Sequence, residues 1–212
     1  MPKISADREA AVRERIIRAA IEVFAEKGYH RATIADVVRR SGLSVGAIYT
    51  YFANKDALFL SSCDLVNDQA MEELGRRLAP LPTTEARLRA AIDYYVETVD
   101  TFDGGPGQAP LVAAWAEAEA DPGVRAMLVR RRERLVGAAT LLLQEGIFRG
   151  DLPDGLDVDP FARAFTGLLD GLLLQRIEAG PDHRPADLAR RAHAVLDVLL
   201  TAARVPSGAV PA

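Results

Sequence analysis

Apolar residues recur at helical spacing along most of the chain, with polar residues on the faces between them. Over residues 7–27 the apolar positions stand four apart, at Val12, Ile16, Ala20 and Phe24. No run of Val, Ile, Thr or aromatic residues shows the alternation of a half-buried strand. The pattern therefore predicts an all-α chain.

Strong start and stop signals divide the first sixty residues into short helices. Gly28 can end the first helix. Thr33 can cap a second helix that Gly42 ends, and Ser44 can cap a third that runs to Tyr51. Three short helices are thus expected before a long one.

The rest of the chain predicts longer helices separated by Pro- and Gly-containing breaks. They are expected over residues 55–78, 84–102, 108–119, 122–149, 160–179 and 186–204. The chain therefore divides into a head of short helices (1–53), a body of longer helices (54–204) and a tail without periodicity that is expected to be disordered (205–212).

The composition is typical of a folded globular protein and gives no sign of a membrane protein or a metalloprotein. Apolar residues make up 49% of the chain and charged residues 26%, which is ordinary for a folded globular protein. Neither a signal peptide nor a stretch of about 18 uncharged apolar residues is found, so a cytoplasmic protein without a membrane partner is expected. Cys63 is the only cysteine and His30, His183 and His193 are scattered, so neither a metal site nor a cofactor is expected.

Charge is distributed unevenly along the chain. Residues 1–60 carry ten Lys and Arg against seven Asp and Glu, whereas the remainder carries sixteen against twenty-three. A basic head on an acidic body suits a protein that presents one end to a polyanion. A solvated helix face could also produce so small an excess.

Residues 33–55 have the order of a helix-turn-helix unit, two short helices joined by a Gly-Leu turn. Its second helix can enter the major groove, and its small first residues and N-terminal amides allow close approach to phosphate. Two tyrosines and Lys55 add phosphate donors, while Ile48 and Phe52 should face the core. The expected DNA-binding residues are Thr33, Ser44, Val45, Gly46, Ala47, Tyr49, Thr50, Tyr51 and Lys55.

These motifs stand in a specific order. Thr33 opens the second helix, Gly42-Leu43-Ser44 forms the turn, Ile48-Tyr49-Thr50-Tyr51-Phe52 closes the third helix, and Lys55-Asp56-Ala57-Leu58-Phe59 begins the fourth. The combination resembles the head of the TetR (tetracycline repressor) family of bacterial transcriptional regulators, whose first helix is also similar to residues 17–29. The remaining chain is similar in architecture only. The resemblance implies that residues 1–53 are a helix-turn-helix DNA-binding domain and residues 54–204 a ligand-binding and dimerisation domain. It also implies a dimer that binds a palindromic operator and a body that binds a small molecule.

Three positions depart from the family's pattern. Members often have Lys or another polar residue at the position of Val45 and Thr at that of Ala47, so few hydrogen bonds to base edges are expected and contacts with thymine methyl groups are favoured. Val38 stands where many members have Ala, which should open the packing of the two helices slightly. The alternative is a purely structural helical unit, but turn, caps and lysine together favour DNA binding.

The segment 160–179 carries more apolar residues than one buried stripe needs. Gly167 and Gly171, one turn apart, permit close approach of another helix, and with 186–204 a four-helix bundle across a twofold axis can form. The alternative is that both helices fill the core of one chain. The expected dimer interface is Phe161, Phe165, Leu168, Leu169, Leu172, Leu188, Val195 and Leu199.

Aromatic and aliphatic residues of the central helices could line an apolar cavity similar to the effector pockets of that family. Each could also be ordinary core. The expected pocket residues are Tyr94, Tyr95, Phe102, Trp115, Met127, Leu141 and Phe148. The run Arg130-Arg131-Arg132-Glu133-Arg134 is typical of a solvated helix face, and Cys63 of an inert buried thiol.

The function that these features favour is a homodimeric DNA-binding transcriptional regulator, a repressor released from its operator by a small apolar effector. In this hypothesis the effector moves the helix that starts near Asn54 and so changes the spacing of the two reading helices. The alternative is a helical ligand-binding bundle or small enzyme without DNA binding. The sequence contains no catalytic motif that would support an enzyme.

Overall fold

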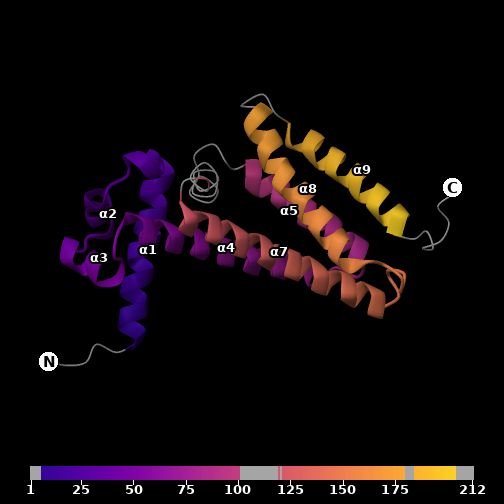
Figure 1. The fold of residues 1–212 in the computed structure, drawn as a ribbon, viewed down its shortest axis with the longest axis horizontal. Helices are drawn as coiled ribbons and strands as arrows, with labels where there is room; N and C mark the ends of the chain where they lie inside the picture. Colours follow the sequence, from indigo (N-terminus) through magenta and orange to yellow (C-terminus); the bar gives the residue numbers. More distant parts are fainter. Residues whose placement is uncertain (1–5, 101–118, 120, 180–183, 204–212) are drawn as a thin grey trace. The chain divides into compact units, whose positions relative to one another are not determined.

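The computed structural model describes residues 6–100, 119, 121–179 and 184–203 (Figure 1). Its helices are α1 (Ala6–Arg31), α2 (Ile34–Ser41), α3 (Val45–Tyr51), α4 (Lys55–Leu78), α5 (Thr84–Asp100), α7 (Pro122–Phe148), α8 (Val158–Ala179) and α9 (Pro185–Ala203). These residues include no strand, and the prediction of an all-α fold is confirmed. The helix predicted over 108–119 lies, apart from Glu119, outside the described residues.

The chain packs as two compact units. Of the described residues, the head unit comprises 6–70, 119 and 121–129, and the body unit comprises 71–100, 130–179 and 184–203. Two long helices, α4 and α7, each contribute to both units. The packing boundary therefore falls inside α4, whereas the sequence-based division was drawn at the start of that helix.

The core of the head unit is built from one face of α1 and from apolar side chains of the following helices. Val37 of α2, Ile48 of α3 and Phe59 of α4 are almost completely buried in it. The rings of Phe24 and Phe59 pack edge to face with centroids 5.2 Å apart. Val124 and Met127, from the first turns of α7, belong to the same core. The head is therefore completed by residues far along the chain.

Glycines end two of the helical runs, as expected. Gly28 has φ +72° and interrupts α1, and Gly42 has φ +67° and caps α2. A residue with a Cβ rarely adopts this left-handed conformation, so glycine is suited to both positions.

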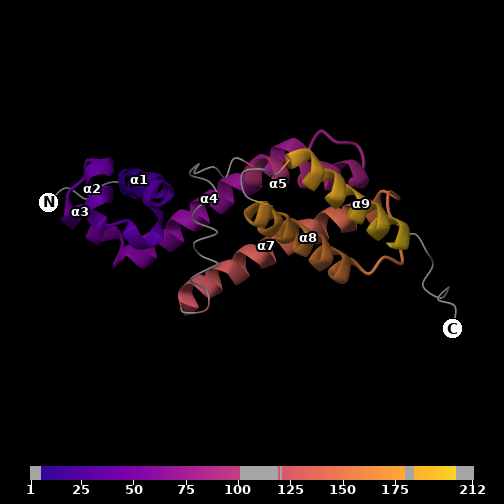
Figure 2. The ribbon, with the colours of Figure 1, turned by 90° about the horizontal axis from the view of Figure 1, so that it is seen from above.

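In the body unit α5, α8 and α9 lie side by side (Figures 1 and 2). The start of α5 also lies close to α7, since a Cβ at Gly146 would collide with the side chain of Thr84. The backbone N–H of Thr84 donates to Asp151 at 2.9 Å and fixes this junction. None of the helices in the described ranges is long and apolar enough to cross a bilayer.

Candidate nucleic-acid interface

The helix-turn-helix unit is defined by local capping. The amide of Asp36 donates to Oγ1 of Thr33 at 3.2 Å, and the amide of Thr33 donates back to the Asp36 carboxylate at 3.0 Å, which completes a capping box. Ser44 accepts from the amide of Ala47 at 3.1 Å and caps α3. The predicted caps Thr33 and Ser44 are confirmed. Together they set where α2 and α3 begin.

Helix α3 has a buried face and an exposed face. Ile48 and Phe52 are buried in the head core, as predicted. Val45 is 50% exposed and Tyr49 is 51% exposed, and Gly46 and Thr50 also lie on the outside. Because residues four apart lie above one another, these residues form two adjacent stripes on the exposed face. Helix α3 can therefore offer this face to a duplex without unfolding the core.

Other predicted DNA-binding residues also have structural roles. Tyr51 is half-buried against the head core, and Ala47 is half-buried as well. Nζ of Lys55 donates to the carbonyl of Tyr29 at 3.0 Å and lies 4.3 Å from the centroid of the Tyr29 ring. Lys55 thus links the start of α4 to the end of α1. A substitution there would disturb more than a phosphate contact.

A second polar contact, between α1 and α2, was not predicted from the sequence. The carboxylate of Asp36 is buried and accepts hydrogen bonds from Lys27 at 2.6 Å and from the hydroxyl of Thr33 at 2.8 Å, with Arg39 also in contact. The hydrogen bonds from Lys27 and Thr33 lower the pKa of Asp36 to about 2. The Thr-x-x-Asp spacing of the capping box could have indicated this role of Asp36. This network holds α2 against the end of α1.

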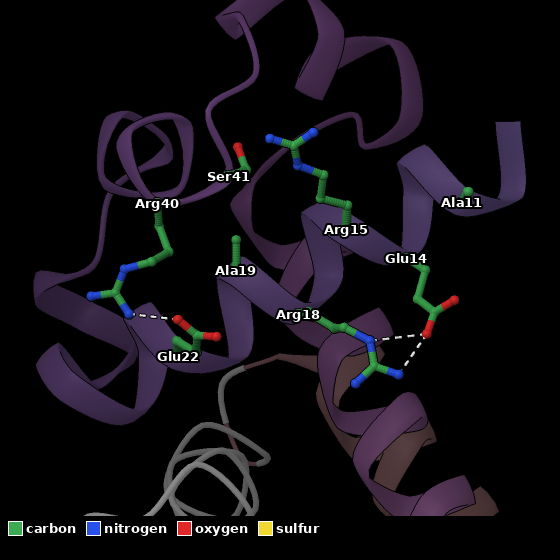
Figure 3. Close-up of a pocket in the computed structure, with 8 residues that line it drawn as sticks. All are labelled: Ala11, Glu14, Arg15, Arg18, Ala19, Glu22, Arg40 and Ser41. Carbon is green, nitrogen blue, oxygen red and sulfur yellow. Dashed lines mark hydrogen bonds and ion pairs between the residues drawn. The ribbon is translucent and has the colours of Figure 1, made fainter. Parts of the chain in front are cut away.

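A groove of about 460 Å³ lies between α1 and the end of α2 (Figure 3). It is lined by Ala11, Glu14, Arg15, Arg18, Ala19, Glu22, Arg40 and Ser41.

Two of its three arginines are held by carboxylates, Arg18 by Glu14 and Arg40 by Glu22, each at 2.6 Å (Figure 3). The third, Arg15, reaches the turn, since a Cβ at Gly42 would be 3.1 Å from its Nη2. In the described part of the chain no carboxylate is paired with Arg15. Its exposed guanidinium is a further cation beside the helix-turn-helix turn, and the sequence reasoning had not selected it.

The predicted effector-pocket residues are dispersed. Tyr94 and Tyr95 lie in the body unit, whereas Met127 is buried in the core of the head unit. Leu141 is 69% exposed and Phe148 is 92% exposed. These two stand seven residues apart and hence on one face of α7, and that face points away from the body core. Phe102 and Trp115 lie outside the described residues.

A buried polar cluster lies where Tyr95 meets α7 and α8. Arg131 donates to the hydroxyl of Tyr95 at 3.0 Å and to Asp170 at 3.1 Å, and all three side chains are buried. Arg132 approaches the other carboxylate oxygen of Asp170 to 3.1 Å, in a geometry that does not make a hydrogen bond. Burial raises the pKa of the Tyr95 hydroxyl. The interpretation of residues 130–134 as a solvated face is therefore wrong for Arg131.

The predicted interface residues fall into two groups. Five of them are buried within the single chain: Phe161, Phe165, Leu169, Leu172 and Leu188. The reason is that α8 packs on both α5 and α9, so most of its apolar surface is already covered.

The apolar surface that remains uncovered lies elsewhere on the same helices. Leu168 and Leu199 are half-buried, and Val195 is exposed. Leu174 on α8 and Val198 on α9, which sequence reasoning had not selected, are also exposed, Val198 to 68%.

Cys63 lies in the head core. Burial raises the pKa of its thiol to about 12, and the nearby charge of Asp64 adds to the shift. Across the described ranges, no group of His, Cys, Asp and Glu is placed to hold a metal ion.

Comparison with known proteins gives two family matches. Residues 16–61 match the family described as bacterial regulatory proteins, tetR family, and residues 84–201 match the BetI-type transcriptional repressor, C-terminal. The transcriptional regulator BetI of Escherichia coli K12 is 30% identical over 193 residues, which cover 90% of this chain and 92% of BetI.

Solved structures share the fold. A transcriptional regulator from Saccharomonospora viridis in complex with choline matches with a TM-score of 0.74 at 19% identity, covering 89% of this chain and 96% of that one. FadR from Bacillus subtilis in complex with stearoyl-CoA matches with a TM-score of 0.70 at 24% identity, covering 89% and 97%.

Proposed function

Because the chain belongs to the TetR family of bacterial regulatory proteins, it is a DNA-binding transcriptional regulator, and we propose that it acts in the cytoplasm as a homodimeric repressor of a palindromic operator. A small apolar effector bound in the body unit would release it. The observation that carries this proposal is the exposed face of α3, which displays Val45, Gly46, Tyr49 and Thr50 while Ile48 is buried in the head core.

Phosphate contacts would fix the register of α3 on the duplex. Tyr49 extends a hydroxyl from the exposed face, and the guanidinium of Arg15 lies beside the turn that precedes α3. The first is a neutral donor and the second a cation, so they should respond differently to salt. A cation that neutralises a phosphate displaces condensed counterions, whereas a neutral donor does not.

A salt titration tests this part of the proposal. The probe is a duplex recovered by selection from random-sequence DNA with the full-length protein. We expect the logarithm of the association constant for DNA to fall linearly with the logarithm of the salt concentration. Arg15→Gln should make this slope less steep by about 0.9, because one phosphate contact is lost. Tyr49→Phe should weaken binding and leave the slope unchanged. Arg18→Gln, in the same groove but paired with Glu14, is the matched control. Affinity that is constant between about 50 and 200 mM salt would contradict the proposal.

Dimerisation is supported by the uncovered apolar stripe on α8 and α9. Val195 and Val198 stand three residues apart on α9, and Leu174 is exposed on α8. Apart from the backbone of α8 itself, no atom of the described residues lies within 4 Å of a Cβ built at Gly167 or Gly171, so a second chain could approach α8 closely there. An exposed apolar stripe beside small residues favours a helix-helix interface.

The dimer is tested by Val198→Asp, which places a charge in the proposed interface without touching the monomer core. We expect sedimentation to report monomers in place of dimers, with an unchanged far-UV circular dichroism spectrum. Gln144→Asp, at an exposed position of α7 outside the proposed interface, is the control for added charge. A wild-type chain that sediments as a monomer at micromolar concentration would refute the homodimer.

An effector site in the body unit is supported by the buried Tyr95–Arg131–Asp170 cluster and by the kinds of ligand seen in structures of the same fold. We expect an apolar effector with one polar group, which the cluster would bind. Tyr95→Phe should weaken release from DNA by such a ligand and leave DNA affinity unchanged in its absence. Choline and stearoyl-CoA, the ligands of those two proteins, are the first probes.

A further inference from the structure

The exposed face of α3 offers few hydrogen-bonding groups to a base edge. Val45 has an apolar side chain and Gly46 has none. The hydroxyl of Thr50 donates to the carbonyl of Gly46 at 2.9 Å, so its hydrogen is used within the helix. The oxygen of Ser44 is engaged with the amide of Ala47. Apolar contact is therefore the main interaction that the centre of this face can make.

Major-groove chemistry says which base suits such a face. Thymine carries a C5 methyl group in the major groove, and the other three bases offer only donors and acceptors there. A valine at the start of the reading helix can contact this methyl group. A glycine beside it leaves room for the backbone to approach. Apart from the backbone of α3 itself, no atom of the described residues lies within 4 Å of a Cβ built at Gly46.

We propose that α3 recognises its operator through the 5-methyl groups of thymine, with Val45 as the specificity-determining residue. This inference rests on the DNA-binding function and names the feature of DNA that is read. Tyr49, which is also exposed, contacts the phosphate backbone in this arrangement and contributes affinity without base preference.

Deoxyuridine provides the test, because it lacks the methyl group of thymine and keeps its hydrogen-bonding pattern. In the selected duplex each thymine of one half-site is replaced in turn by deoxyuridine, and affinity is measured for the wild-type, Val45→Ala and Tyr49→Phe proteins. We expect one or two positions at which deoxyuridine weakens wild-type binding about fourfold, the effect of one methyl group leaving an apolar contact. The loss should fall below about twofold for Val45→Ala and remain about fourfold for Tyr49→Phe.

Three results would overturn the inference. Equal wild-type affinity for all thymine and deoxyuridine duplexes would show that no methyl group is read. An undiminished loss in Val45→Ala would show that the methyl group acts through DNA shape rather than through this side chain. Failure of the wild-type protein to select any duplex would remove the operator-binding function itself, which separates that failure from the first two. Val45 is half-exposed, so its substitution leaves the head core intact.

Discussion

The two units differ in how they place their buried charges. In the head unit the ionised Asp36 stands at the start of α2, where Lys27 and Thr33 bond it and Lys27 is partly exposed. In the body unit Arg131 of α7 and Asp170 of α8, which are 39 positions apart in the sequence, meet in the interior. The first arrangement strengthens a helix start, and the second joins two helices across the core.

This difference bears on what each unit can tolerate. A carboxylate at a helix N-terminus is stabilised by the local amides, and a partly exposed partner such as Lys27 can regain water if the pair is broken. A charge in the interior has been separated from water, and without its partner it is strongly unfavourable. We therefore expect the head unit to be robust to changes of charge and the body unit to be sensitive to them.

The largest effect is expected from Arg131→Met, which leaves Asp170 buried without its main partner. The free energy of unfolding should fall by about 3–5 kcal/mol, measured by urea denaturation. Arg132→Met removes the exposed partner of the same carboxylate and should cost much less. Similar losses in the two variants would mean that the interior pair is not the critical one.

A slightly smaller effect is expected from Met127→Ala, because Met127 is fully buried in the head core although it belongs to α7. The loss should be about 2–5 kcal/mol, with faster amide exchange in α1 and in the first half of α4. Val129→Ala, two residues along and exposed, is the control. Faster exchange confined to α5, α8 and α9 would show that the start of α7 does not complete the head.

Helix caps should give intermediate effects that differ between the units. Thr33→Ala removes the cap of α2 and half of a capping box, and it should cost about 1–2 kcal/mol. Thr83→Ala removes a single cap bond of α5, to the amide of Ala86 at 3.2 Å, and should cost about 0.5–1 kcal/mol. Equal costs in thermal denaturation would show that the additional hydrogen bond from the Thr33 hydroxyl to Asp36 adds nothing.

The smallest effect concerns pH. The pKa of Asp36 is lowered in the folded chain to about 2, so its stabilising effect is complete above its ordinary pKa and is lost as pH falls toward 2. The stability of wild-type protein should decline over this window, from about pH 4 to about pH 2, more steeply than that of Asp36→Asn. Parallel pH profiles would show that Asp36 has the same pKa in the folded and unfolded chains.

The predictable features of the head depend on residues close together in sequence. Thr33, Gly42 and Ser44 act on the backbone within four residues of themselves, so their roles follow from spacing alone. Ile48 and Phe52 share one face of a short helix, and because this face is apolar it was expected in the core and the opposite face in solvent. The contribution of Met127 to the same core was not predictable in this way, because nothing in the sequence of α7 indicates which unit it joins.

In the body, hydrophobic pattern alone could not separate core from surface. The eight residues selected as an interface include five that the single chain already buries, since α8 is covered from two sides. Leu141 and Phe148 carry the same apolar signal as the buried Val136 and Leu143 of α7, yet both are exposed. Burial there depends on which neighbours the helix finds, and periodicity gives only which residues share a face.

By itself the sequence determined the all-α class, the family, the turn of the helix-turn-helix unit and the identity of the exposed face of α3. Each of these depends on helix propensity, capping and spacing within a few turns. Only the tertiary structure decided that Arg131 is an interior partner of Asp170. It also decided that Lys55 and Asp36 link helices of the head to α1, and which apolar residues of α8 and α9 are left uncovered. Those outcomes depend on contacts between distant segments, whose free energy is set by the desolvation and packing of both partners at once.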